Sequence, residues 1–300
     1  MKSSGCQLYK FLTEDAGVRT TSEKKPSDGK ELFYGHGYTL VELLVAMAIT
    51  LVVMAAVYKV YVSQQDSYLL QEQVAELQQN ARTAKYIMTR EIRMAGYDPF
   101  GTAGAKFESA AGDSIRFTMD ILPKNADGTV GDGTITVPGD DITYAVFADD
   151  GGQINLGRND GSNNRALVEN IEAVGFGYAF DNDDDGELDT DPGSGNIIWA
   201  FDSDGSGTLD KDLDTNNDGV IDAADSVDGV DLPVAVAVTG EVALEKIRAV
   251  RIWILARTAN EEKGYSDTST YVLANQRVSV NDGRRRQLVI TTVKCRNLGL

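Results

Sequence analysis

One acidic residue, Glu42, lies inside an otherwise apolar run over residues 38–57, which reads YTLVELLVAMAITLVVMAAV. A helix of about 20 mostly apolar residues is long enough to cross the hydrocarbon core of a bilayer. A carboxylate within such a segment is costly and marks a partner or a function. The run therefore predicts a membrane-spanning helix in which the charge of Glu42 needs an explanation.

The residues that open this run form a motif. Gly37 is followed by the aromatic Tyr38, then by Thr-Leu, an aliphatic residue and Glu42. This order resembles the amino terminus of type IV prepilins and pseudopilins. The resemblance implies that a prepilin peptidase cleaves after Gly37 and methylates the new amino terminus, Tyr38. It also implies that Glu42 faces the amino-terminal cation of a neighbouring subunit and sets axial register, because leaving either charge alone is expensive.

Three features depart from the family pattern. The first mature residue is Tyr rather than Phe, His36 stands in place of a basic residue, and the leader over residues 1–37 is long. A secretory signal or plain membrane anchor with one stray acid is the alternative. Signal peptides have shorter apolar cores followed by a small-residue cleavage site, and no such site follows this run directly.

After Lys59 the chain becomes amphipathic. Apolar residues recur every three or four positions at Leu70, Val74, Leu77, Ala81, Ala84, Met88, Ile92 and Ala95. This spacing predicts that the helix of residues 38–60 continues over residues 61–96 with one face against a folded domain. Gly96 and Pro99 are typical of a helix end. An independent coiled coil is the alternative for this half.

The rest of the chain, residues 97–300, has a sequence pattern typical of β-strands. Apolar residues alternate in short runs separated by Gly and Asp-Gly turns, which is typical of strands. The predicted strands cover residues 115–119, 142–146, 174–180, 246–257 and 287–296. We therefore predict an α+β fold, pilin-like, with a long amino-terminal helix packed on an antiparallel sheet. Trp199 and Trp253 are expected to be core or sheet-face residues rather than ligand contacts.

Two further stretches narrow the resemblance. The segment REIRMAGYDP over residues 90–99 is similar to the PilW group of pilus-assembly minor pilins, as are Arg285-Arg286, Thr291-Thr292-Val293 and Arg296-Asn297-Leu298. The first stretch also resembles the J-type minor pseudopilins of type II secretion, which remain the main competitor. The three arginines of residues 284–286 predict a turn or a subunit contact.

Negative charge is concentrated in residues 181–231. This segment holds 17 acidic residues and one Lys, a net charge of −16 in a chain of net charge −18. Such crowding destabilises a compact loop by self-repulsion unless cations neutralise it or the segment stays open in water. We interpret it as an insertion in the sheet domain.

The acids of this insertion follow the spacing of calcium loops, in which oxygen ligands alternate and a glycine makes the sharp bend. In the third loop, residues 214–225, positions 1, 3, 5, 6, 7 and 12 are Asp214, Asn216, Asp218, Gly219, Val220 and Asp225. The second loop opens with Asp202, Asp204, Ser206, Gly207 and Asp210, and the first with Asp181, Asp183, Asp185, Gly186 and Asp189. Their twelfth positions, Leu213 and Pro192, carry no carboxylate, so Asp212 or Asp191 would have to substitute.

These loops predict one to three calcium ions, because calcium tolerates flexible oxygen geometry better than magnesium does. The alternative for the first two loops is a solvated acidic linker. The segment also resembles dockerin loops, but residues 226–229 do not continue a flanking helix, which disfavours a cohesin-binding role. We expect calcium to order the insertion and shape a face that meets other pilins or an adhesin.

Catalysis finds little support. The only histidine, His36, lies in the predicted leader, and no Gly-rich phosphate loop with Lys is present. The acidic charge disfavours nucleic-acid binding. Cys6 falls in the leader, so Cys295 cannot form an intramolecular disulfide in the processed chain, and we expect it to be a buried strand residue; an intermolecular bond is the alternative.

We therefore predict a non-enzymatic minor pilin that takes part in initiating type IV pilus assembly, in the tip or priming complex. Its expected partners are prepilin peptidase, other minor and major pilins and the inner-membrane assembly platform. It would cross the inner membrane once, with the carboxyl-terminal domain in the periplasm, before joining the pilus. A type II secretion pseudopilin and a calcium-dependent membrane-anchored adhesin or hydrolase are the alternatives.

Overall fold

The computed structural model describes residues 37–122, 130–135, 138–232 and 241–298. The predicted leader lies outside these residues except for Gly37. The chain divides into two compact units, Met1–Tyr58 and Lys59–Leu300.

A single helix, α1, runs from Leu40 to Ile92 over 53 residues. No Gly or Pro interrupts it, so no residue removes a backbone hydrogen bond or kinks it. It is long and apolar enough to cross a membrane, and its most apolar stretch is 0% buried. The predicted continuous helix is confirmed, except that residues 93–96 form turns and Gly96 adopts a φ of 75°.

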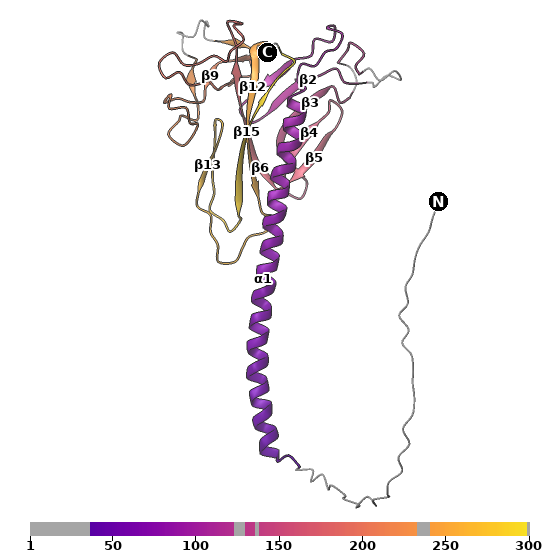
Figure 1. Ribbon diagram of the computed structural model, residues 1–300, viewed down its shortest axis with the longest axis vertical. Helices are drawn as coiled ribbons and strands as arrows, with labels where there is room; N and C mark the ends of the chain where they lie inside the picture. The colour runs from indigo at the N-terminus through magenta and orange to yellow at the C-terminus, as the bar shows by residue number, and fades with distance from the viewer. Residues whose placement is uncertain (1–36, 123–129, 136–137, 233–240, 299–300) are drawn as a thin grey trace, which may run out of the picture. The chain divides into compact units, whose positions relative to one another are not determined.

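The strands form two main antiparallel sheets (Figure 1). The six-stranded sheet has the order β10 (Val230–Asp231), β9 (Lys211–Asp212), β7 (Ala200–Phe201), β6 (Ile171–Phe180), β12 (Ile247–Arg257) and β15 (Arg286–Lys294). The five-stranded sheet has the order β1 (Phe107–Ala110), β2 (Ile115–Thr118), β3 (Asp141–Ala148), β4 (Ile154–Asn159) and β5 (Asn164–Glu169). The predicted α+β class is confirmed, whereas the expectation of one sheet is corrected to two.

Two short strand pairs and one 3₁₀ turn complete the described fold. β11 (Val242–Ala243) pairs with β8 (Thr208–Leu209), and β13 (Thr270–Leu273) pairs with β14 (Gln276–Ser279). A 3₁₀ turn, η1 (Leu244–Lys246), leads into β12. The β13–β14 hairpin lies on β6, where Gln276 Nε2 donates to the carbonyl oxygen of Val174 over 2.7 Å.

The inner face of α1 belongs to the core of the folded unit. Leu77, Ala81, Ala84, Met88 and Ile92 are buried there together with residues of both sheets. This burial removes the alternative of an independent coiled coil. Both tryptophans are buried in the core, as predicted, and Cys295 is fully buried directly after β15. Figure 1 shows the carboxyl-terminal end of α1 lying against the strands.

Candidate assembly and cation-binding sites

The predicted processing site is exposed. Gly37 and Tyr38 precede the first turn of α1, and Tyr38 is 88% accessible. No other part of the described chain lies within 4 Å of a side chain built at Gly37. The peptide bond between these residues is therefore open to an enzyme.

Glu42 caps the amino end of α1. Its Oε2 accepts hydrogen bonds from the backbone N–H of Thr39 over 2.9 Å and from the Thr39 hydroxyl over 3.0 Å. The Thr39 Oγ1 in turn accepts from the N–H of Glu42 over 3.2 Å. This reciprocal pair is a capping box, which satisfies N–H groups that lack a partner in the first turn of a helix. Thr39 is a capping residue that the sequence prediction missed, although the Thr-x-x-Glu spacing signals it.

The third acidic loop has the backbone geometry that its spacing predicts. Asp214 Oδ1 and Oδ2 accept from the N–H groups of Asp218 and Gly219 over 3.1 and 2.7 Å. Asn216 Oδ1 accepts from Asp218, and Asp218 Oδ1 accepts from Val220. Gly219 has a φ of 87°, which an L residue adopts only with strain. The acid at position 1 is thus held inside the turn.

The first two loops repeat this arrangement. Asp181 accepts from the N–H groups of Asp185 and Gly186, and Asp202 accepts from those of Ser206 and Gly207. The contacts of the third position are also repeated, because Asp183 accepts from the N–H of Asp185 and Asp204 accepts from the N–H of Ser206. The three first-position aspartates, Asp181, Asp202 and Asp214, are only 1%, 5% and 3% exposed.

The carboxylate that closes each loop differs between the loops. In the third, Asp225 Oδ1 accepts from the N–H of Thr215, the second loop position, over 2.8 Å. In the first two, the acids at position 9 take this role: Asp189 accepts from Asn182 over 3.4 Å, and Asp210 accepts from Ser203 over 2.7 Å. The first two loops therefore close three residues earlier than the third.

The expected substitutes for the missing twelfth ligands lie elsewhere. Asp191 accepts from Gly193 and Ser194 in its own turn, and Asp212 accepts from the N–H of Asp214. Asp189 instead joins Asp181 and Asp183, and one oxygen from each carboxylate lies within 4.8 Å of the others. An aspartate three residues after the glycine in both repeats was the signal for this closure.

The pKa values of two carboxyl groups in the insertion are raised by burial and by neighbouring negative charges. Burial, with the nearby charges of Asp183 and Asp181, raises the pKa of Asp189 to about 6 against the hydrogen bond from Asn182. Burial likewise raises the pKa of Asp212 to about 7. A bound cation would offset the cost of ionising both carboxyl groups.

The acidic insertion is folded onto the six-stranded sheet. It supplies β7, β9 and β10, so among the described residues it is a part of the sheet rather than an open linker. Arg251 of β12 lies 4.1 Å from the ring centroid of Trp199. Arg277 of β14 donates to the carbonyl oxygens of Asp222 and Asp225 over 3.0 and 2.5 Å. These contacts join the insertion to β12 and β14.

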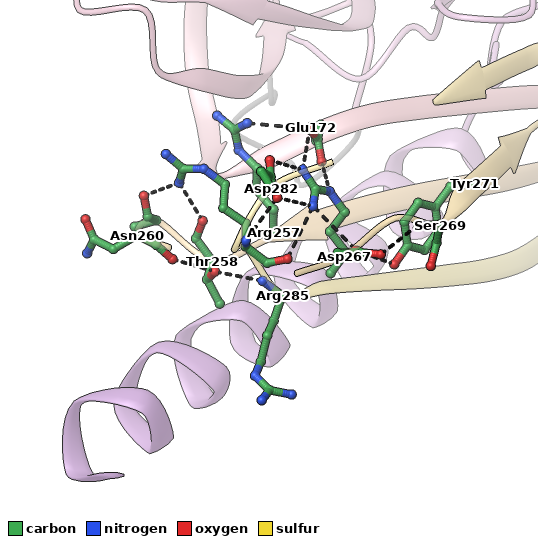
Figure 2. Close-up of polar contacts among 12 residues, drawn as sticks. Glu172, Arg257, Thr258, Asn260, Asp267, Ser269, Tyr271, Asp282 and Arg285 are labelled. Atoms are coloured by element: carbon green, nitrogen blue, oxygen red, sulfur yellow. Dashed lines mark hydrogen bonds and ion pairs between the residues drawn. The ribbon is translucent and has the colours of Figure 1, made fainter. Parts of the chain in front are cut away.

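A second carboxylate-rich region surrounds Arg286 at the start of β15 (Figure 2). Its side chain is 1% exposed and forms bidentate ion pairs with Glu172 and Asp282 and a third pair with Asp267. The hydrogen bond from Arg286 lowers the pKa of Asp282 to about 2. The arginine thus joins β15, β6 and the segment between β12 and β15.

The two preceding arginines also have partners within the chain. Arg284 donates to the carbonyl oxygens of residues 258 and 259. Arg285 pairs with Glu262 over 2.6 Å and lies 4.5 Å from the ring centroid of Tyr265. The arginines of residues 284–286 therefore hold the loop after β12 against the start of β15, which is the turn role that the sequence suggested.

The chain matches two protein-family models. Residues 200–297 match the model of the type IV pilus-assembly protein W, and residues 34–58 match the prokaryotic N-terminal methylation motif. No curated protein sequence matches the chain. Among solved structures, a type IV-like pilin from Thermus thermophilus is similar at 15% identity and a TM-score of 0.35, covering 76% of this chain and 98% of that one.

Proposed function

We propose, from the premise that this chain is a type IV pilus minor pilin of the PilW family with a prepilin motif, that it takes part in initiating pilus assembly in the tip or priming complex. The PilW family consists of structural components, so the protein is not an enzyme. The observation that carries the proposal is the apolar half of α1, whose most apolar stretch is 0% buried and opens with the prepilin motif. Such a surface needs lipid or the helices of other subunits around it.

Processing precedes assembly in this proposal. Prepilin peptidase cleaves after Gly37 at the inner membrane and methylates Tyr38, and the carboxyl-terminal domain lies in the periplasm until the subunit joins the pilus. The exposure of both residues supports access by the enzyme. Partners of the processed subunit are other minor and major pilins and the inner-membrane assembly platform.

Glu42 performs two tasks in this account. Within the chain it caps α1 through Thr39. In the assembly, its negative charge pairs with the amino-terminal cation of a neighbouring subunit. The pair fixes axial register because a lone buried charge costs about 3–5 kcal/mol relative to the intact pair.

Two substitutions separate these tasks. Glu42→Gln keeps an oxygen that accepts from Thr39 but removes the charge, whereas Thr39→Ala removes the cap and keeps the charge. We expect Glu42→Gln to abolish recovery of the protein in sheared pili and Thr39→Ala to leave it largely intact, with membrane levels equal by immunoblot. Normal recovery of Glu42→Gln would contradict the register role.

We further propose that one to three calcium ions bind the acidic loops. The buried first-position aspartates and the three oxygens of Asp181, Asp183 and Asp189 support this, because the loops offer hard oxygen ligands and excess negative charge. Asp214, Asn216, Asp218, Asp225 and the Val220 carbonyl would hold the ion of the third loop. Asp202, Asp204, Ser206 and Asp210 would hold that of the second, and Asp185 would complete the first.

Calorimetric titration of the full-length protein in detergent with calcium chloride tests this. We expect binding that Asp214→Asn weakens in the third loop and that Glu187→Gln leaves unchanged, since the Glu187 side chain is exposed and the seventh position supplies only its carbonyl. A titration without binding heat at several temperatures would remove the calcium proposal but leave the pilin assignment intact.

A further inference from the structure

The outer face of α1 carries a group of cations that the assembly proposal does not use. Arg82, Lys85, Arg90 and Arg93, together with Tyr86, form what we call the basic stripe. All five side chains are exposed, and they line a shallow groove of about 460 Å³. Residues three and four apart are neighbours on a helix surface, so these charges act together.

The cations of the stripe have no charged partner among the described residues. Among the described residues, no ion pair or hydrogen bond involves the side chain of any of the four, and the one side-chain contact is to the backbone of Arg93, whose carbonyl oxygen accepts from Asn297 Nδ2 over 3.4 Å. The acid nearest in sequence, Glu91, points to the other side of the helix, where it accepts from Arg158 over 2.9 Å and from the Tyr144 hydroxyl over 2.5 Å. Glu91 therefore does not neutralise the stripe.

This lack of partners stands out in a chain that is otherwise acidic. The stripe contributes four positive charges to a protein of net charge −18, while residues 181–231 contribute −16. Nine acidic side chains of the insertion are exposed: Asp183, Asp184, Asp185, Glu187, Asp204, Asp218, Asp222, Asp228 and Asp231. Of these, Asp184 pairs with Lys246 and Arg248, and Asp231 pairs with Lys211, while no ion pair is found for the other seven within the described chain. The molecule thus has two exposed surfaces of opposite charge that no ion pair joins within the described chain.

We propose that the basic stripe of one molecule receives the acidic insertion of a second copy of this chain. Charge complementarity favours this occupant, since each molecule carries both halves of the contact and the insertion keeps a net negative charge even with three divalent cations bound. Double-stranded DNA and anionic lipid also carry negative charge, and the test below distinguishes them from a second copy.

The geometry of such a contact has a consequence for assembly. The stripe and the insertion are different surfaces, so the contact is heterologous and leaves one free stripe and one free insertion at the ends of any pair. It can therefore continue from copy to copy or join this subunit to its neighbour along a filament axis. The inference goes beyond the proposed function, because it requires neither calcium nor cleavage of the leader.

Cross-linking of the full-length protein in detergent micelles tests the contact. Equal amounts of ¹⁴N- and ¹⁵N-labelled protein are mixed at low salt with EDTA and treated with a carbodiimide, which joins an amine to a carboxylate without a spacer. We expect mass spectrometry to find Lys85 linked to carboxylates of residues 181–231 between differently labelled copies. The yield should fall at 1 M salt, where the Debye length is about 3 Å.

Charge reversal on each surface supplies the controls. The pair Arg82→Glu and Arg93→Glu should lower the yield at least about tenfold, because it brings the net charge of the stripe from +4 to 0 and removes its attraction for the insertion. The pair Glu187→Lys and Asp228→Lys should do the same, since both side chains are exposed and have no side-chain contact with described residues. Mixing the two reversed proteins should restore links between opposite copies through the new complementary charges.

Several results would overturn the inference. They are the absence of links between copies, links from Lys85 mainly to acids outside residues 181–231, and failure of the two reversed proteins to rescue each other. Binding of double-stranded DNA or phosphatidylglycerol vesicles that Arg82→Glu and Arg93→Glu abolish, with no self-association, would assign the stripe to those ligands instead. Circular dichroism of each variant confirms that α1 is intact.

Discussion

Two carboxylate-rich regions of the folded unit handle their charge in opposite ways. Around Arg286, the carboxylates of Glu172, Asp267 and Asp282 share a buried guanidinium and Glu172 also pairs with Arg257, so two cations face three carboxylates inside the chain. In the insertion, 17 acids share the segment with one Lys, and among the buried first-position aspartates only Asp181 has a cationic partner, Arg248 over 3.9 Å, whereas Asp202 and Asp214 accept from backbone N–H groups. The first region holds its own cations, and the second keeps a large excess of negative charge.

The difference shows what each arrangement is suited to do. The ion pairs around Arg286 link β6 to β15 through side chains of the protein itself, without a bound ligand. A loop that depends on external cations responds to its surroundings, because anything that binds only the folded state stabilises it by mass action. Under the calcium proposal, the insertion is the region through which the ion acts on stability.

Removing the central arginine should have the largest effect on stability. Arg286→Met leaves three carboxylates without their buried cation, and we expect a loss of about 3–5 kcal/mol in the free energy of unfolding. Arg285→Met is the matched control: its side chain is 38% exposed, so we expect a loss of about 0–1 kcal/mol. Urea denaturation followed by tryptophan fluorescence measures both. Equal losses would show that the network does not stabilise the sheet.

Calcium should stabilise the insertion by a smaller amount. At 100 times the dissociation constant, one ion raises the free energy of unfolding by about 2.7 kcal/mol. Asp225→Asn should remove the part of this calcium stabilisation that the third loop contributes. Asp228→Asn should keep it, because Asp228 is an exposed acid outside the ligand positions. Thermal unfolding with calcium and with EDTA measures the shift. The same loss in both variants would point to general charge screening.

The pH dependence of stability should separate the two regions further. The pKa of Asp282 is lowered to about 2 by its hydrogen bond with Arg286, against about 3.9 in an unfolded chain. The contribution of the Asp282 carboxylate to the free energy of unfolding is therefore present above about pH 4 and is lost as the pH falls towards 2. We expect wild-type stability to fall more steeply over this range than that of Asp282→Asn. Parallel curves would exclude Asp282 as a source of acid sensitivity.

The smallest effect concerns Cys295. Burial raises the pKa of its thiol to about 12, and its exposed fraction is 0%. In a Cys6→Ala background we expect no reaction with a maleimide at pH 8 in the native protein and complete reaction in denaturant. Rapid labelling of the native protein would favour the alternative of an accessible, intermolecular cysteine.

The helix and the central strands could be predicted because their patterns are local. Apolar spacing placed α1, and alternation placed β2, β3, β6, β12 and β15 close to their observed bounds. β4 and β5 were missed since sequences such as Ile154–Asn159 are polar and contain Gly157, and their pairing depends on backbone hydrogen bonds with distant strands. The same reason applies to the two-residue strands of the insertion.

The candidate sites also divide into features that are local in sequence and features that depend on distant residues. The calcium-type spacing and the Thr39–Glu42 cap can be read within a few residues, although the closing role of Asp189 and Asp210 was overlooked in favour of the twelfth position. The partnership of Arg286 with Glu172 spans 114 residues. No local pattern predicts such a pair, because only the register of β6, β12 and β15 brings the two side chains together.

Mass spectrometry of the amino terminus of the protein recovered from cells tests the central claim most directly. A processed pilin subunit should begin at N-methylated Tyr38, and the full-length form should accumulate when the peptidase is absent. A protein that keeps residues 1–37, or that begins after the apolar run, would contradict the account.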